Sequence, residues 1–333
     1  MASACSFVRV SISKLSTFRV GHRPPFLPFE LCRARRTLCS ISSTSQKHSH
    51  PVPSSSSSPP SSSSFIMETV GNTRWRPMCL YYTQGKCTKV DDPAHLEIFN
   101  HDCSRELRVS AADLERKSSQ EFNFFLVLDL EGKVEILEFP VLMVDAKTME
   151  VVGLFHRFVR PTKMSEQAIN RYIEGKYGKL GVDRVWHDTA LPFNQVLEQF
   201  EAWLAGHNLW GEESGGVLND AAFVTCGNWD LKTKIPEQCK VSNIKLPPYF
   251  TEWINLKDVY LNFYGQEARG MVTMMRQREI RLMGSHHLGI DDTKNITRVL
   301  QRMLADGAVL KITARRSNSD PRNVEFLFKN RIR

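Results

Sequence analysis

Apolar and polar residues in the central part of the chain are arranged as they are in β-strands. The apolar run that opens residues 124–131 is typical of a β-strand that is covered on both faces, so we expect a strand over 124–131. The runs 134–145 and 151–160 predict antiparallel neighbours, joined by a turn, and 222–226 predicts a further buried strand. These segments together predict an α/β sheet.

Two later segments have apolar residues at helical spacing instead. The first covers 193–204, and the second follows Asp291 and Asp292. One of these two acids is expected to cap the second helix, which leaves the other free. Ser110 is a candidate N-cap of a short linker helix. The apolar stripe of the second helix consists of Ile296, Val299, Leu300, Met303 and Leu304.

Carboxylates stand where the strands end. Asp129 and Glu131 end the first strand, and side chains two apart on a strand point to one face, roughly 7 Å from each other. Two acids placed this way repel each other unless a cation lies between them, and Mg²⁺ or Mn²⁺ prefers oxygen ligands. The alternative is an ordinary strand end with two solvated acids.

More groups of the same kind arrive later in the chain. Asp230 comes just after the strand at 222–226, and active-site groups of α/β sheets gather at such ends. His287 precedes Asp292 by five residues. A histidine beside a fourth acid strengthens the hypothesis of a metal-dependent active site.

Composition narrows the classes of function. The chain has 333 residues, a formal charge of +8 and a pI near 9.1, which favours an acidic partner such as nucleic acid. Alternatively, much of this charge belongs to a leader that is removed. The sequence contains no apolar run long enough to predict a transmembrane helix, and its 8 cysteines do not predict a disulfide scaffold.

Residues 1–66 form a segment of different composition. It is rich in serine and basic residues, and Glu30 is its one acid. This composition is typical of an organellar transit peptide, and we favour the chloroplast over the mitochondrion. The stretch 51–64 is almost all Ser and Pro, which predicts disorder. The alternative is a disordered tail of a cytoplasmic protein.

Residues 70–108 carry a cluster of metal-ligating residue types, and we call this segment the Cys/His module. Cys79, Cys87, His95 and His101 can surround one tetrahedral Zn²⁺, with Cys103 as an alternative fourth ligand. So short a segment has little core, so the metal would supply its folding free energy. The module resembles Cys-Cys-Cys-His RNA-binding fingers, with His95 in the place of a cysteine. The alternative is a loop with incidental Cys and His.

Three motifs of the chain resemble those of DEDDh 3′–5′ exonucleases. They are Asp129-Leu130-Glu131, Asn228-Trp229-Asp230 and His287-Leu288-Gly289-Ile290-Asp291-Asp292. Glu138-Phe139-Pro140 and Trp253-Ile254-Asn255-Leu256 narrow the resemblance to the Eri-type, or histone-mRNA 3′ exonuclease, subfamily. The resemblance implies an RNase H-like mixed sheet flanked by helices, which the Cys/His module precedes.

The resemblance also implies a two-metal site. Asp129, Glu131 and Asp292 would hold one Mg²⁺, and Asp129 would bridge to a second. Asp230 would support the second ion through water, and His287 would be the general base. We expect the neighbouring acids to raise the pKa of His287, so that activity improves towards alkaline pH.

The terminal nucleotide would lie among residues that the same resemblance identifies. Gly132 and Gly181 would line its pocket, although both adjoining segments depart from the family pattern. Lys133 would offer a phosphate contact, and Trp229 would stack on a base unless it is a core residue.

We therefore expect a transit segment at 1–66, the Cys/His module at 70–108, an exonuclease domain at 120–318 and a basic tail at 319–333. The tail region would grip a phosphate backbone, or be merely solvated. The expected function is trimming of RNA 3′ ends, with precursors of ribosomal RNA in the chloroplast as the favoured substrate. The alternatives are a DNA-directed exonuclease and a non-catalytic RNA-binding protein. The basic residues meant are Arg315, Arg316, Arg322, Lys329, Arg331 and Arg333.

Overall fold

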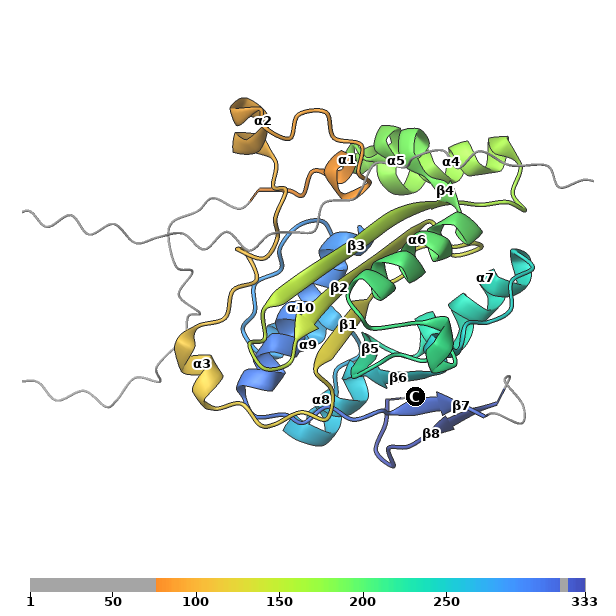
Figure 1. Ribbon diagram of the computed structural model, residues 1–333. Coiled ribbons are helices and arrows are strands. Elements are labelled where there is room, and N and C mark those ends of the chain that lie inside the picture. Colours follow the sequence, from red (N-terminus) through yellow and green to blue (C-terminus); the bar gives the residue numbers. More distant parts are fainter. Residues whose placement is uncertain (1–75, 318–322, 333) are drawn as a thin grey trace, which may run out of the picture. The chain divides into compact units, whose positions relative to one another are not determined.

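A mixed eight-stranded sheet forms the centre of the computed structural model, which describes residues 76–317 and 323–332. The strands are ordered β4-β3-β2-β1-β5-β6-β7-β8 (Figure 1). β1 lies antiparallel to β2, as predicted, and parallel to β5. Their bounds are β1 Phe124–Leu128, β2 Glu138–Asp145, β3 Val151–Arg160, β4 Leu191–Pro192, β5 Ala221–Thr225, β6 Glu252–Asn255, β7 Ala314–Arg316 and β8 Val324–Phe326.

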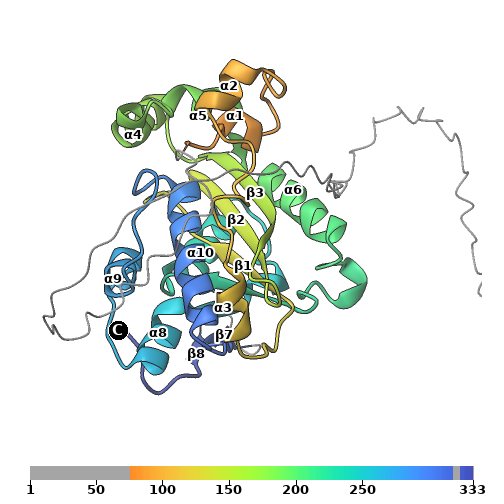
Figure 2. The ribbon, with the colours of Figure 1, turned by 90° about the vertical axis from the view of Figure 1, so that its left-hand side faces the viewer.

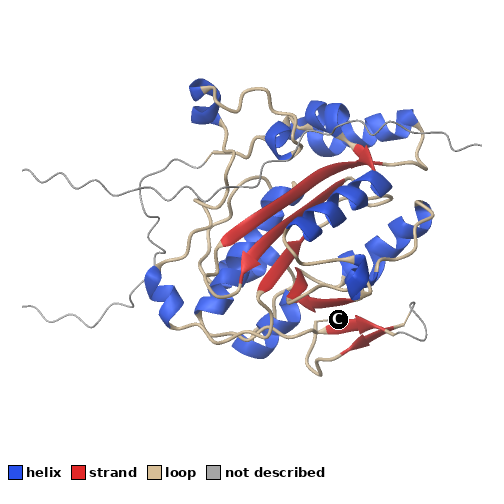
Figure 3. Ribbon diagram, viewed as in Figure 1, coloured by secondary structure: helices blue, strands red, loops and turns tan. Residues whose placement is uncertain are grey.

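Helices cover both faces of the sheet (Figures 2 and 3). Phe125 and Val127 of β1 point into a core shared with α8, α9 and α10, whereas Leu126 and Leu128 point into a core shared with α6 and α7. This alternation explains why β1 is apolar at every position. The α-helices are α1 Leu80–Thr83, α2 Pro93–Ile98, α3 Ala111–Glu115, α4 Glu166–Tyr177, α5 Asp183–Thr189, α6 Phe193–Gly206, α7 Ile235–Val241, α8 Leu256–Tyr264, α9 Met271–Gln277 and α10 Gly289–Ala305.

Short helical turns connect these elements. They are the 3₁₀ turns η1 Gly178–Leu180, η2 Glu212–Ser214 and η4 Pro248–Phe250, and the π-helical turn η3 Asp230–Lys234. None of the helices in the described part of the chain has the length and hydropathy that a membrane crossing requires. The predicted transit segment at 1–66 lies outside the described residues.

Three element predictions need correction. The first strand ends at Leu128, before the acids, and the second begins at Glu138, because 132–137 form a turn. The expected basic tail is partly wrong: β8 pairs with β7, and the Ile332 N–H donates to Asp258. Arg316 is buried and donates to the Leu231 carbonyl at 2.7 Å, so its charge serves the fold. The Ser110 N-cap is confirmed, since its side chain accepts from the Asp113 N–H.

Candidate active site

Three carboxylates from opposite ends of the domain sequence meet at the end of β1. Ligand oxygens of Asp129, Glu131 and Asp292 all lie within 4.8 Å of one another, and we call these residues the carboxylate cluster. Asp129 and Glu131 follow β1, and Asp292 lies in the first turn of α10, which packs against β1 and β2. Gly289 allows this approach, because a Cβ there would lie 3.1 Å from Glu131 Cγ and 3.2 Å from the Asp129 carbonyl.

The cluster is electrostatically costly without a cation. Burial, together with the charges of Asp230, Asp292 and Glu131, raises the pKa of Asp129 well above its ordinary value. Burial also raises the pKa of Glu131 to about 7, although Lys176 opposes this change. Hard oxygen donors that repel one another in a partly buried site fit Mg²⁺ or Mn²⁺.

Asp230 stands beside this cluster and begins the π-helical turn η3. It is 5% exposed, and its Oδ1 accepts a hydrogen bond of 3.0 Å from the Leu130 N–H. Burial raises its pKa to about 6. A π-turn is rare and is frequent at functional sites, and here it directs Asp230 back to the end of β1. The placement agrees with a supporting role for a second metal ion.

Asp291 and Asp292 both reach back to the loop before α10. Asp291 Oδ2 accepts from the Ser285 N–H at 2.9 Å, and Asp292 Oδ2 accepts from the His287 N–H at 2.8 Å. The predicted helix cap is therefore wrong, because the N-cap is Leu288, which has no side-chain acceptor. Both acids are inside the helix, where they fix the loop that carries His287.

Glu138 of β2 supplies the missing cap. Its Oε2 accepts from the Gly289 N–H at 3.0 Å, and its Oε1 accepts from the Ile290 N–H at 2.8 Å. Tyr177 donates to the same carboxylate at 3.0 Å. Burial alone would raise the pKa of Glu138, but the hydrogen bond and charge of His156 and these N–H groups lower it. The carboxylate thus stays charged at the positive end of the helix dipole.

His287 is exposed and lies next to Asp292, which suits a group that exchanges protons with solvent. Burial of its ring, with the nearby His286 and Lys176, lowers its pKa below the ordinary value, although Asp292 opposes this change. The expected rise in this pKa is therefore wrong, because burial and the charges of His286 and Lys176 together outweigh the charge of Asp292.

Several groups of the site were missed from the sequence. His286 Nδ1 lies 3.0 Å from both carboxylate oxygens of Asp292, and its ring stacks on that of His287. Lys176 of α4 donates to Glu131 at 2.7 Å and to the His287 carbonyl at 3.0 Å. The doublet His286-His287 was visible in the sequence, but no local pattern marks Lys176.

The predicted nucleotide-binding residues differ in exposure. Trp229 is 45% exposed and Lys234 Nζ lies 5.3 Å above its ring, so the core alternative is excluded. Lys133 is exposed, and its backbone N–H donates to Tyr172. Gly132 has φ +127°, and a Cβ there would lie 2.1 Å from the Glu135 carbonyl oxygen. Gly181 ends η1 in the left-handed region, so both glycines are required by the backbone.

The Cys/His module brings its four predicted ligands together. Atoms of Cys79, Cys87, His95 and His101 lie within 4.8 Å of one another. Cys87 Sγ lies 3.7 Å from His95 Nε2 and 3.8 Å from His101 Nε2, and the two Nε2 atoms are 3.2 Å apart. Around a tetrahedral Zn²⁺ with ordinary bond lengths, these separations are about 3.6 Å and about 3.3 Å. Cys103 instead packs in the core, which corrects the alternative ligand.

Comparisons with known proteins identify the family. Residues 125–300 match the family model described as "Exonuclease" (RNase_T), and the chain belongs to this family. An exonuclease domain-containing protein of Arabidopsis thaliana is 73% identical over 337 residues, which cover all of both chains. ERI1 exoribonuclease 3 of Homo sapiens is 32% identical over 206 residues, or 59% of this chain and 58% of that protein.

A solved structure supports the same assignment. The solved structure described as "3'-end specific recognition of histone mRNA stem-loop by 3'-exonuclease" is 26% identical, with a TM-score of 0.53. The match covers 64% of this chain and 93% of that one. These findings confirm the RNase H-like fold and the resemblance to Eri-type DEDDh exonucleases. The chain spans little more than half the length of the mammalian exoribonucleases it matches.

Proposed function

We propose that the chain is a 3′–5′ exoribonuclease that hydrolyses RNA 3′ ends with two divalent metal ions. The observation that carries this proposal is the carboxylate cluster, with His287 beside Asp292 and Asp230 at the same end of β1. A relative named as an exoribonuclease matches 59% of this chain. Two ions bound there would stabilise the attacking and the leaving oxygens.

The roles of the chain's own groups follow from their placement. Asp129, Glu131 and Asp292 would hold the first ion, Asp129 would bridge to the second, and Asp230 would hold the second through water. His287 would take the proton of the attacking water. A lowered pKa favours the neutral form of the His287 imidazole, which is the form that a general base needs. The bond that breaks joins phosphorus to the 3′ oxygen of the penultimate nucleotide, and a nucleoside 5′-monophosphate leaves.

The terminal base would stack on Trp229, which is exposed next to Asp230 and is held against Lys234. Lys133 would contact a phosphate from the turn after β1, where Gly132 allows the backbone to pass close to the Glu135 carbonyl. Gly181 would border the same pocket. We propose structured RNAs with short 3′ overhangs as substrates, with chloroplast ribosomal RNA precursors favoured by the composition of residues 1–66.

We also propose that the Cys/His module binds one structural Zn²⁺. The support is the agreement between the Sγ and Nε2 separations and those of a tetrahedral site. The Nε2 atoms of His95 and His101 lie 3.2 Å apart. Two imidazole nitrogens this close repel each other unless a cation or a single shared proton lies between them.

Digestion of a 5′-labelled RNA hairpin with a 3′ overhang tests the activity. The wild-type chain should shorten it one nucleotide at a time with Mg²⁺ or Mn²⁺, and an Asp129→Asn/Glu131→Gln variant should not. Glu174→Gln, an exposed acid of α4, is the matched control. Equal digestion of a DNA hairpin of the same sequence would favour a DNA-directed enzyme. Binding without cleavage under either metal would favour a non-catalytic RNA-binding protein.

A further inference from the structure

The Cys/His module packs against strand β3 of the sheet, and a series of side-chain contacts joins this strand to the active site. α1 packs against β3 and α5, at the end of the sheet where β4 pairs only with Val159 and Arg160 (Figure 1). Ahead of that pairing, the Gln84 side chain covers the strand edge. Its Oε1 accepts from the Phe158 N–H at 3.0 Å, and its Nε2 donates to the His156 carbonyl at 3.2 Å.

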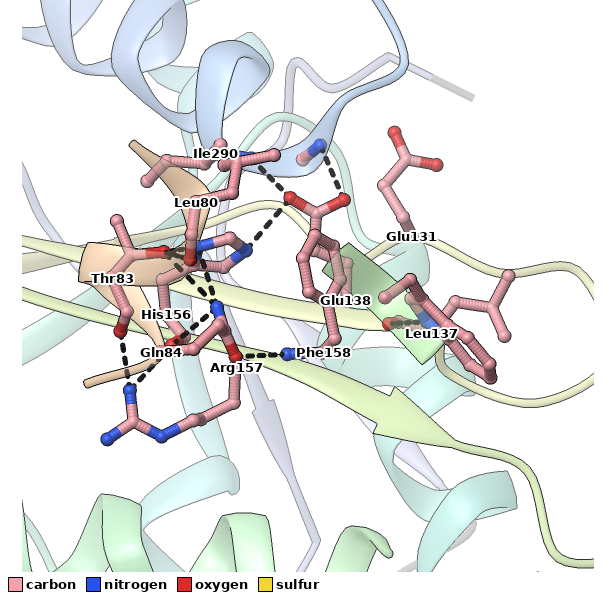
Figure 4. Close-up of polar contacts among 12 residues, drawn as sticks. Leu80, Thr83, Gln84, Glu131, Leu137, Glu138, His156, Arg157, Phe158 and Ile290 are labelled. Atoms are coloured by element: carbon pink, nitrogen blue, oxygen red, sulfur yellow. Dashed lines mark hydrogen bonds and ion pairs between the residues drawn. The ribbon is translucent and has the colours of Figure 1, made fainter. Parts of the chain in front are cut away.

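A buried histidine continues this contact into the sheet. His156 Nδ1 lies 2.8 Å from Thr83 Oγ1 and 3.2 Å from Gln84 Nε2. On its other side, Nε2 lies 3.1 Å from Glu138 Oε1, and both side chains of this pair are fully buried (Figure 4). A buried polar pair is strongly destabilised when one member loses its partners, so the pair keeps its position only while those partners are present. The module supplies the partners on the Nδ1 side.

Glu138 then meets the helix that carries Asp292. It accepts the Gly289 and Ile290 N–H groups, and Figure 4 shows this carboxylate between His156 and the start of α10. Asp292 follows two residues later within the same turn. A shift of Glu138 would therefore move Asp292 relative to Asp129 and Glu131.

At the module's end, one candidate metal ligand, Cys79, shares a helical turn with the contact residues Thr83 and Gln84. Cys79 is the N-cap of α1, and the Thr83 N–H donates to the Cys79 carbonyl at 3.1 Å. A helix of four residues does not hold its shape alone, so α1 depends on what fixes Cys79.

We propose that the zinc-bound Cys/His module positions the active site, through the series Thr83 and Gln84, His156, Glu138 and the first turn of α10. This inference rests on the zinc site proposed above. It makes Thr83, Gln84, His156 and Glu138 positioning residues, none of which is expected to touch the metals or the RNA.

Amide hydrogen exchange of the full-length chain tests the proposal. It is measured with zinc present, after zinc is removed with a chelator that does not bind Mg²⁺, and after zinc is added back. Amide protection of Gly289 and Ile290 should fall about tenfold or more without zinc and recover with it. Protection of Val299–Ala305 in the same helix should not change. Exchange that rises in residues 79–101 and is unchanged at Gly289 and Ile290 would overturn the proposal.

Two variants give a second test that keeps the zinc ligands intact. Gln84→Met together with Thr83→Val should bind zinc normally, yet raise the Mg²⁺ concentration needed for half-maximal digestion at least about fivefold, with near-normal kcat at saturating Mg²⁺. Tyr81→Phe is the matched control, since it removes the module's hydrogen bond to Asp188, which lies away from the series. An effect of Tyr81→Phe equal to that of the double variant, or none from either, would overturn the proposal.

The outcomes separate this proposal from those on which it rests. Absence of bound zinc in the purified chain, with no response of residues 79–101 to the chelator, would remove the zinc site itself. A zinc-dependent change at Gly289 and Ile290 without any RNA digestion would uphold the positioning and refute the enzyme.

Discussion

Replacing Glu131 by glutamine should stabilise the metal-free protein while it abolishes activity. The pKa of this carboxyl rises from an ordinary 4.5 to about 7, mainly through burial, so ionising it in the fold costs at most about 3 kcal/mol at pH 8. A carboxyl whose folded pKa is raised contributes stability below its unfolded pKa and loses it as the pH rises through about 7. Glu131→Gln removes this loss, because glutamine stays neutral.

Urea unfolding in magnesium-free buffer at pH 8 and pH 5 measures the effect. The variant should exceed wild type by about 3 kcal/mol at pH 8 but by less than about 1 kcal/mol at pH 5, where most of the difference in ionisation is gone. Saturating Mg²⁺ should reverse the order at pH 8, because wild type alone gains the binding energy. The difference in unfolding free energy between Glu174→Gln and wild type should be the same at both pH values. A Glu131→Gln variant that is less stable than wild type at pH 8 without metal would refute the electrostatic reasoning.

Three other variants test separate parts of the site. Trp229→Ala should raise the KM for RNA at least about fivefold and cost about 1–3 kcal/mol in unfolding, since about half of the ring is covered; an unchanged KM would exclude base stacking. Gly132→Ala should cost about 2 kcal/mol or more in urea unfolding, because its Cβ would meet the Glu135 carbonyl. His287→Gln should lower kcat at least about a hundredfold, and the rising limb of the wild-type pH profile should lie below pH 6.5, the ordinary histidine pKa; a limb above it would contradict the lowered pKa.

The long apolar strands and the order of the acids were predictable from the sequence. β1 and β5 are buried on both faces, so each is an uninterrupted apolar run that can be located in the sequence. Asp129, Glu131 and Asp292 belong to motifs short enough to be matched directly. The clustering of the module's Cys and His side chains was predictable because these residue types are rare at such close spacing.

The contacts that join distant segments were not predictable. Glu138 was part of a family motif, but its role at the start of α10 depends on a fold that brings together residues about 150 positions apart. Lys176 reaches Glu131 from a helix whose own pattern explains it as a surface residue. The wrong helix cap has the same origin, because a local rule for Asp291 and Asp292 overlooked an acceptor supplied by the sheet.

Mass analysis of the first products formed in H₂¹⁸O tests the central claim most directly. The full-length chain with Mg²⁺ and a single-stranded RNA should release nucleoside 5′-monophosphates from the 3′ end, each with one ¹⁸O on phosphorus from the attacking water. Nucleoside 3′-phosphates, cyclic phosphates or fragments cut from the interior would contradict a water-dependent 3′–5′ exoribonuclease at the carboxylate cluster.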